Sequence, residues 1–208
     1  MPKGSPKLTA ARREEIINAC ERLYETVGFK DITLKDIGEE TRFTRTSVYN
    51  YFNTKEEIFL ALFKREYDRW NDDLEALLRA EGKLSDEELA DRIARTVESR
   101  GRLLRLLSMN IYDMETHSSP EALVSFKRSY GKSLENMDLI LRKFRPEMSV
   151  ERRGVFVRLF FPFMFGIYPY TSLTGKQKAA MEEAGINPNL KTVYELTKEY
   201  LIKLLSAK

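Results

Sequence analysis

The sequence has a single cysteine, Cys20, and a single histidine, His117. One cysteine excludes an intramolecular disulfide and is typical of proteins from a reducing compartment. The two residues lie far apart in the chain and form no pattern of a nucleophile beside its base. The HExxH, CxxC, P-loop and dinucleotide glycine motifs are missing, as is the ExxH pattern of di-iron helical bundles. We therefore expect no enzyme, no catalytic residue, no metal site and no cofactor.

Long uninterrupted apolar runs are also missing. The most apolar stretch, 155–170, is interrupted by Arg158, Pro162, Gly166 and Pro169. It falls short of the roughly 20 residues that a helix needs to cross a bilayer. The first fifteen residues contain no apolar segment of the kind found in signal peptides. We therefore expect a cytoplasmic protein with no membrane partner.

A strong excess of one charge sign is likewise absent, since the net charge is +3 and the first sixty residues hold ten basic and ten acidic side chains. The distribution is more informative than the total. Between residues 41 and 55 the chain carries Arg42, Arg45 and Lys55 but no acidic residue. Because phosphate neutralisation is local, such an acid-free segment can approach a nucleic acid even where the average charge is zero.

The pattern of apolar residues predicts an all-α fold. No stretch alternates polar and apolar residues as a half-buried strand does, whereas apolar residues recur at helical spacing. Gly28 is expected to end a first helix, 10–27, as a left-handed cap. Cap patterns mark further helix starts at Thr33 with Asp36, Thr54 with Glu57, and Ser85 with Glu88. We expect the later helices at about 102–115, 120–144, 150–168, 174–184 and 190–205.

The segment 32–58 combines these features in a helix-turn-helix pattern. Ile32, Leu34 and Ile37 form the inward face of a short helix, and Phe43, Val48 and Phe52 do so for the turn and the next helix, which is expected to run to about Tyr51. The remaining side chains are expected to be partly exposed: Thr44, Arg45, Thr46, Ser47, Tyr49, Asn50 and Tyr51. A small polar helix face of this kind fits the major groove of DNA.

The order T-x-x-x-I, a turn, and T-R-T-S-V-Y-N-Y-F-x-x-K-E-E-I resembles the DNA-binding domain of TetR-type transcription regulators over residues 10–60. The resemblance implies a homodimer that binds a double-stranded DNA operator. It implies that Thr44 caps the recognition helix and that Arg45 and Thr46 lie nearest the base edges, where Arg45 could contact guanine or phosphate. The further DNA-binding candidates are Thr33, Ser47, Tyr49, Asn50, Tyr51 and Lys55. Of these, Thr33, Tyr49, Tyr51 and Lys55 match backbone-phosphate positions.

Arg42 departs from the family pattern, which often has a glycine at this position of the turn. An arginine in a left-handed turn costs about 1 kcal/mol more than a glycine. Two interpretations remain open: Arg42 adds a phosphate contact, or the turn has a different conformation.

We expect the helix-turn-helix domain to span residues 1–54 and a helical effector-binding and dimerisation domain to span 55–208. The helix predicted at 150–168 is apolar on nearly every side, so one of its faces is expected to pack on a partner subunit. The resemblance implies that this helix and the last one pair with their copies. The residues expected in the dimer interface are Phe156, Phe160, Phe163, Met164, Ile167, Val193, Leu196, Tyr200 and Leu204.

The resemblance also implies an unknown small-molecule effector in the second domain. Candidate lining residues combine apolar surface with a few polar tips, as ligand pockets do. They are Trp70, Met109, Tyr112, Met114, His117, Phe126, Tyr130, Met137, Phe161, Phe165 and Tyr168. The same aromatic and methionine residues at helical spacing are also typical of an ordinary hydrophobic core, and both interpretations stay open here.

The sequence therefore predicts a ligand-responsive repressor that binds a palindromic operator as a homodimer. The main alternative is a helical protein-interaction module that does not bind DNA. A second alternative is a small-molecule-binding helical enzyme, which would show turnover and no affinity for DNA.

Overall fold

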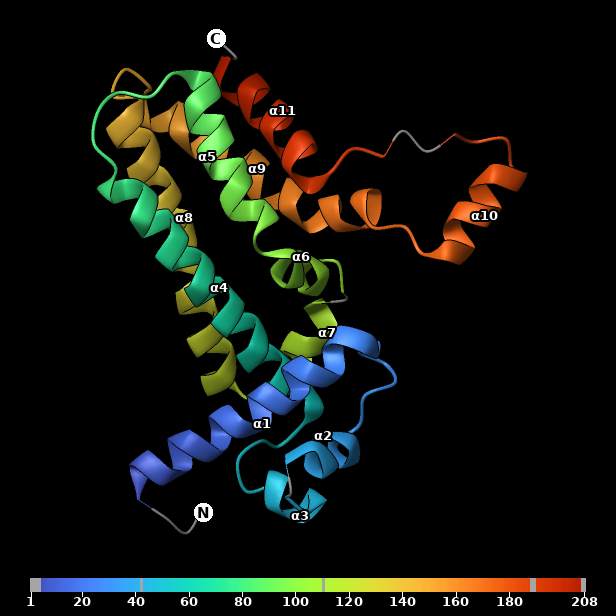
Figure 1. Cartoon of the computed structure of the whole chain (residues 1–208). Coiled ribbons are helices and arrows are strands. Elements are labelled where there is room, and N and C mark those ends of the chain that lie inside the picture. The colour runs from blue at the N-terminus through green and yellow to red at the C-terminus, as the bar shows by residue number, and fades with distance from the viewer. Residues whose placement is uncertain (1–4, 42, 110, 188–189, 207–208) are drawn as a thin grey trace. The chain divides into compact units, whose positions relative to one another are not determined.

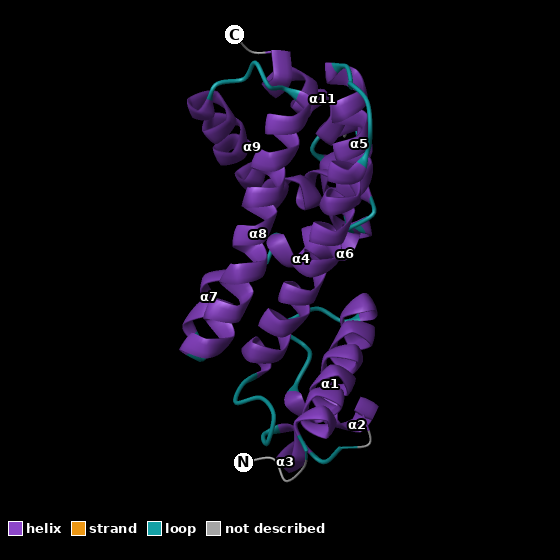
Figure 2. Cartoon of the chain, turned by 90° about the vertical axis from the view of Figure 1, so that its left-hand side faces the viewer, coloured by secondary structure: helices purple, strands orange, loops and turns teal. Residues whose placement is uncertain are grey.

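The computed structural model describes residues 5–41, 43–109, 111–187 and 190–206. Within these residues the chain forms helices and no strand (Figure 2). The all-α fold expected from the sequence is confirmed. In chain order (Figure 1) the helices are α1 Pro6–Thr26, α2 Leu34–Thr41, α3 Arg45–Val48, α4 Lys55–Arg79, α5 Asp86–Glu98, α6 Gly101–Leu107, α7 Ile111–Thr116, α8 Pro120–Phe144, α9 Val150–Thr171, α10 Gly175–Glu183 and α11 Val193–Ser206.

Internal contacts divide the chain into two compact units. Unit 1 comprises residues 1–65 and 110–129, and unit 2 comprises residues 66–109 and 130–208. Helices α4 and α8 each begin in unit 1 and continue in unit 2. The domain boundary expected between residues 54 and 55 stays a prediction. In the structure α7 and the first turns of α8 cluster with the N-terminal helices.

Unit 1 has a hydrophobic core between α1, α2 and the first half of α4. Ile16, Cys20, Ile37 and Phe59 are fully buried, and the Tyr24 and Phe59 rings meet edge to face at 5.3 Å between their centroids. Burial raises the pKa of the Cys20 thiol well above its ordinary value, which makes this cysteine an inert core residue. This core holds α2 against α1, and α3 packs on α2 in turn.

The helix starts agree with the cap patterns more closely than the helix ends do. The Thr33 hydroxyl accepts from the Asp36 amide at 3.3 Å, and the Asp36 carboxylate accepts from the Thr33 amide at 2.8 Å, so the capping box that opens α2 is confirmed. The reciprocal box between Ser85 and Glu88 at the start of α5 is also confirmed.

The prediction that Gly28 caps α1 in a left-handed conformation is wrong. Helix α1 ends at Thr26, the extended residue Val27 follows, and Gly28 is not among the glycines with positive φ. Helix α3 ends at Val48 rather than near Tyr51, because the chain continues in tight turns. The helix predicted at 102–115 is two helices, α6 and α7, and the last helix begins at Val193 rather than Leu190.

Unit 2 is a bundle in which α11 packs on α5 and α9, and α6 packs on α9. Its core contains a group of aromatic rings: the Trp70 ring centroid lies 5.8 Å from that of Phe161, which lies 5.7 Å from that of Tyr130. The Trp70 indole donates a hydrogen bond to the Thr96 hydroxyl at 3.0 Å. In the described part of the chain, no helix combines the length and the apolar character that a membrane span requires.

Candidate nucleic-acid interface

Helix α3 is a single capped turn, and its position is set by local hydrogen bonds. The Thr44 hydroxyl accepts from the Ser47 amide at 3.1 Å, which satisfies one of the free donors at the start of the helix. The Phe52 amide then donates to the Val48 carbonyl at 3.1 Å, so the chain continues as a turn towards α4. Thr44 is therefore the cap of this helix, as the sequence indicates.

Beneath α3 lies a buried apolar layer formed by Ile37, Val48 and Phe52. The Tyr51 and Phe43 rings stack nearly parallel, with 6.5 Å between their centroids. Four of the predicted DNA-binding residues are exposed above this layer: Thr44, Thr46, Tyr49 and Asn50. Ser47 and Tyr51 are partly exposed. Polar side chains thus cover an apolar base, as a groove-binding surface requires.

The structure describes the basic residues of the segment 41–55 to different extents. Arg42 lies outside the described residues, and for Arg45 only the backbone, which begins α3, is described. The Lys55 ammonium donates to the Phe29 carbonyl at 2.8 Å and lies 4.3 Å from the Phe29 ring centroid. Thr33 is exposed and is engaged in the α2 capping box.

Two arginines of α1 also reach this region, although the sequence pattern did not single them out. The Arg13 guanidinium lies 4.0 Å from the Phe52 ring centroid and donates to the Tyr51 carbonyl. The Arg12 guanidinium lies 5.5 Å from the Phe43 ring centroid and is partly exposed. The only sequence signal was the lack of acidic residues among the first thirteen, because helical spacing within α1 does not reveal which later segment a side chain meets.

Glu57 connects this region to the start of α8. Its carboxylate accepts from the Asn53 amide and from the Ser119 amide, each at 2.9 Å, and the residue is buried. Burial acts to raise the pKa of Glu57, but the hydrogen bonds from Ser119 and Asn53 outweigh it, so the pKa lies below its ordinary value. The neighbouring Thr54 hydroxyl donates to the His117 carbonyl at 3.0 Å. Residues 117–119 are thereby attached to the loop that follows α3.

The residues predicted to line a ligand pocket fall in both units. Trp70, Met137 and Phe161 are buried in unit 2, where Met109, Tyr130, Phe165 and Tyr168 are partly buried. Met114 and Phe126 are buried in unit 1, and the Phe126 ring lies 5.0 Å from that of Phe63. Tyr112 and His117 are exposed, the former to 79%. The structure therefore brings together Trp70, Tyr130 and Phe161, but not the whole predicted set.

The residues predicted for a dimer interface divide between buried and accessible positions. Phe156, Phe160, Met164 and Ile167 lie in the core of the protomer. The other five are partly exposed: Phe163, Val193, Leu196, Tyr200 and Leu204. The Phe163 and Tyr200 rings stack at 4.1 Å, and the Tyr200 hydroxyl donates to the Leu159 carbonyl at 3.0 Å. Beside them α9 exposes Val155 and Leu159, to 40% and 47%, and the sequence had not separated these from the buried positions.

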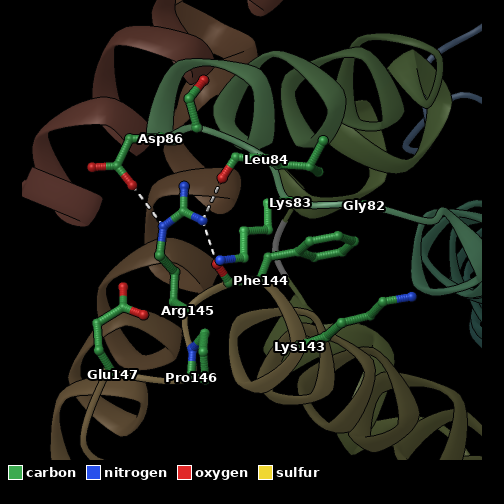
Figure 3. Close-up of a pocket in the computed structure, with 10 residues that line it drawn as sticks. Gly82, Lys83, Leu84, Asp86, Lys143, Phe144, Arg145, Pro146 and Glu147 are labelled. Atoms are coloured by element: carbon green, nitrogen blue, oxygen red, sulfur yellow. Dashed lines mark hydrogen bonds and ion pairs between the residues drawn. The ribbon is translucent and has the colours of Figure 1, made fainter.

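Unit 2 has a surface hollow of about 390 Å³ between the start of α5 and the end of α8 (Figure 3). Arg145 lies beside it, buried, and donates to the Asp86 carboxylate at 2.6 Å and to the Leu84 carbonyl at 2.8 Å. Lys143 donates to the carbonyls of Leu78, in the last turn of α4, and of Ala80, one residue after this helix. None of the predicted pocket residues lines this hollow, and its Lys143 and Arg145 side chains join helix ends.

Comparisons with known proteins agree with this architecture in both parts of the chain. Residues 16–62 match the family described as "Bacterial regulatory proteins, tetR family", and residues 64–206 match "Tetracyclin repressor-like, C-terminal domain". The HTH-type transcriptional regulator YfiR of Bacillus subtilis, described as uncharacterized, is 37% identical over 68 residues, which are 31% of this chain and 33% of that protein. The matched segment spans from 30% to 44% of the length of these curated relatives.

Solved structures share the fold over nearly the whole chain. The fatty acid degradation regulator FadR of Bacillus halodurans has a TM-score of 0.61 at 16% identity and covers 99% of this chain and 98% of its own. The regulator FadR of Bacillus subtilis, solved with stearoyl-CoA, has a TM-score of 0.56 at 19% identity over 93% of this chain and 97% of its own. Because the C-terminal family match alone spans more than half of the residues, the chain belongs to the TetR family of transcriptional regulators, whose members are not enzymes.

Proposed function

We propose that this regulator is a ligand-responsive repressor that binds a palindromic DNA operator as a homodimer in the cytoplasm. The observation that carries the proposal is the surface around α3. Exposed Thr44, Thr46, Tyr49 and Asn50 cover an apolar base in a segment that has no acidic residue. A negatively charged duplex can approach this surface without charge repulsion.

Individual roles follow from position on the helix. Arg45 and Thr46 stand at the N-terminal end of α3, the end of a recognition helix that contacts base edges. Thr33, Tyr49, Tyr51 and Lys55 are proposed to hold the DNA backbone, and Ser47 and Asn50 are further DNA-binding candidates. For Arg42 a phosphate contact is one of two open interpretations. Lys55 begins α4, so its charge and the free amides of the helix start can act on the same phosphate.

The homodimer is proposed because a palindrome presents two half-sites in successive major grooves, and a twofold pair of proteins matches them. The accessible apolar side chains of α9, Val155 and Leu159, support a contact between copies. With the partly exposed Phe163, Leu196 and Tyr200 they form an apolar surface that a lone protomer leaves in water.

The effector is proposed to bind in unit 2, near Trp70, Tyr130 and Phe161. FadR of Bacillus subtilis, which shares the fold, was solved in complex with stearoyl-CoA, and this supports the proposal that a protein of this fold can bind an effector. The response would require that the ligand prefers one of two states of the protein. Helix α4, which belongs to both units, is proposed to carry that coupling.

The decisive experiment is a selection of bound fragments from a genomic DNA library by the purified full chain. We expect a palindromic sequence whose affinity falls steeply as salt rises. Arg45→Ala is expected to weaken binding to that sequence about 10-fold or more, with little change in thermal stability. Arg92→Ala, at an exposed position of α5, is the matched control and is expected to leave binding unchanged.

Failure to select any specific duplex would overturn the regulator proposal and favour the protein-interaction module. A large loss of thermal stability in Arg45→Ala would place this arginine in the fold rather than at the DNA.

A further inference from the structure

Helix α10 is specified at both ends by its own sequence. At its start the Thr174 hydroxyl accepts from the Gln177 amide at 3.2 Å, and the Gln177 side chain accepts from the Thr174 amide at 2.9 Å. At its end Gly185 has a φ of 70°, and the Ile186 amide donates to the Met181 carbonyl at 2.8 Å. These contacts are a capping box and a Schellman motif, so local sequence favours a helix that begins and ends at these residues.

The same helix has no packing of its own. None of its nine residues is buried, and Figure 1 shows it set apart from α9 and α11, the helices that precede and follow it. Isolated helices shorter than about 12 residues are marginal in water, because most helical stability in proteins comes from packing. The described residues of the protomer therefore give α10 little of the packing that usually stabilises a helix of this length.

The charges of α10 run against its dipole. Lys176 lies in its first turn and Glu183 is its last residue, with no acidic residue in the first turn and no basic residue in the last. The partial charges of a helix favour the opposite order. This arrangement is unfavourable for the helix alone, but it is favourable when a second copy lies alongside in the antiparallel direction.

The charged ends share one face of the helix. With 3.6 residues per turn, Lys176 lies about 40° and Glu183 about 60° from the direction of Ala180, on the same side. Ala184 lies about 40° from Ala180 on the other side, so two small side chains form the centre of this face. Lys178 and Glu182 point away from it, at about 160°.

We propose that α10 packs antiparallel against α10 of a second copy of this chain, with Lys176 of each copy opposite Glu183 of the other. Twofold symmetry then gives two identical ion pairs around a close approach at Ala180. The partner is a second copy because the charge order is complementary to itself, and because α10 joins α9 and α11, which carry the accessible apolar residues of the proposed dimer. The inference rests on the homodimer proposed above and adds a second contact to it.

Charge reversal tests this pairing in the full chain. Lys176→Glu and Glu183→Lys are each expected to raise the dimer dissociation constant, measured by sedimentation at low salt, by about 5-fold, because each places like charges together twice. The double variant, Lys176→Glu with Glu183→Lys, is expected to recover to within about 2-fold of the original value. Both single changes also improve the fit to the helix dipole, so loss of the helix cannot explain a weaker dimer.

Lys178→Glu and Glu182→Lys are the matched controls, since they make the same charge changes on the opposite face of α10. We expect each to leave the dissociation constant within about 2-fold of the original. Equal effects of Lys176→Glu and Lys178→Glu, or no recovery in the double variant, would overturn the α10 pairing while the dimer itself stands. A chain that stays monomeric at tens of micromolar would instead refute the homodimer and the α10 contact with it.

Discussion

The surface around α3 in unit 1 and the surface along α9 in unit 2 are both accessible, yet they are chemically opposite. Around α3 the exposed side chains of Thr44, Thr46, Tyr49 and Asn50 all carry polar groups, and they cover the buried Val48 and Phe52. Along α9 the exposed side chains include Val155 and Leu159, beside the buried Phe156 and Phe160. Exposing a polar surface to water costs little free energy, whereas covering an apolar surface lowers the free energy. The contrast supports the proposals of a DNA partner for the surface around α3 and of a second protomer for the surface along α9.

The largest change in stability is expected when the apolar layer beneath α3 loses a side chain. Phe52→Ala should lower the free energy of unfolding of unit 1 by about 3–5 kcal/mol, because a buried ring is lost and a cavity remains. Tyr49→Ala, in the same turn but 44% exposed, should change it by less than about 0.5 kcal/mol. Urea denaturation followed by circular dichroism measures both. Similar losses in the two variants would show that the surface does not rest on a separate core.

The next largest effect is expected when a charged side chain is introduced into the apolar surface of α9 without disturbing the fold of the protomer. Leu159→Glu should raise the dimer dissociation constant by about 100-fold, since a buried charge would lack a partner in the interface. The melting point of the protomer should hardly change, because Leu159 is already partly in water. Val124→Glu on α8, at a similarly exposed position of unit 1, is the control. A dimer that tolerates Leu159→Glu would remove α9 from the interface.

An intermediate effect is expected at Glu57, whose carboxylate joins the loop after α3 to the start of α8. Glu57→Gln should lower the free energy of unfolding by about 1–2 kcal/mol, because a charge-assisted acceptor for the Asn53 and Ser119 amides is weakened. Glu56→Gln makes the same charge change one residue away, and it should lower the free energy of unfolding by less.

The pH dependence of Glu57 follows from its lowered pKa. Its contribution to stability is present above the ordinary glutamate pKa and is lost as pH falls through the lower value of the folded state. The difference between the original chain and Glu57→Gln should therefore shrink on acidification. A difference that grows in acid would mean that Glu57 is stabilised in its protonated form.

The smallest effect is expected at Asp91, a surface carboxylate that joins α5 to α11. Hydrogen bonds from Arg95 and then Tyr194 lower the pKa of Asp91 to about 2. Its contribution is present above the unfolded pKa and is lost as pH falls towards 2. Because the group is partly exposed, Asp91→Asn should cost less than about 1 kcal/mol at neutral pH. A loss comparable to that of Phe52→Ala would contradict the view that packing, and not charge, holds α11 in place.

Much of the fold could be predicted because helix starts are encoded within a few residues. Thr33 with Asp36, Thr44 with Ser47 and Ser85 with Glu88 all form the expected local hydrogen bonds. The helix ends were less predictable. Gly28 has no left-handed conformation, because Val27 had already left the helix in an extended one. The break between α6 and α7 falls where the local pattern still allowed one helix.

The candidate site was predicted in outline for the same reason. The exposed polar residues of α3 follow from its short amphipathic pattern, whereas the approach of Arg13 to Phe52 and of Ser119 to Glu57 depends on segments distant in the chain. Likewise the aromatic residues of the second domain could not be assigned to core or pocket by spacing. Trp70 and Phe161 meet in the core, and Tyr112 is exposed.

The sequence alone determined the all-α architecture, the caps of α2, α3 and α5, and the family, because each depends on residues three or four positions apart or on a short ordered motif. Tertiary structure decided that 110–129 joins unit 1, that Val155 and Leu159 rather than Phe156 and Phe160 face water, and that α10 is left without packing. These features depend on which distant segment covers a given side chain, and local periodicity cannot distinguish a surface covered by the same chain from one that remains open.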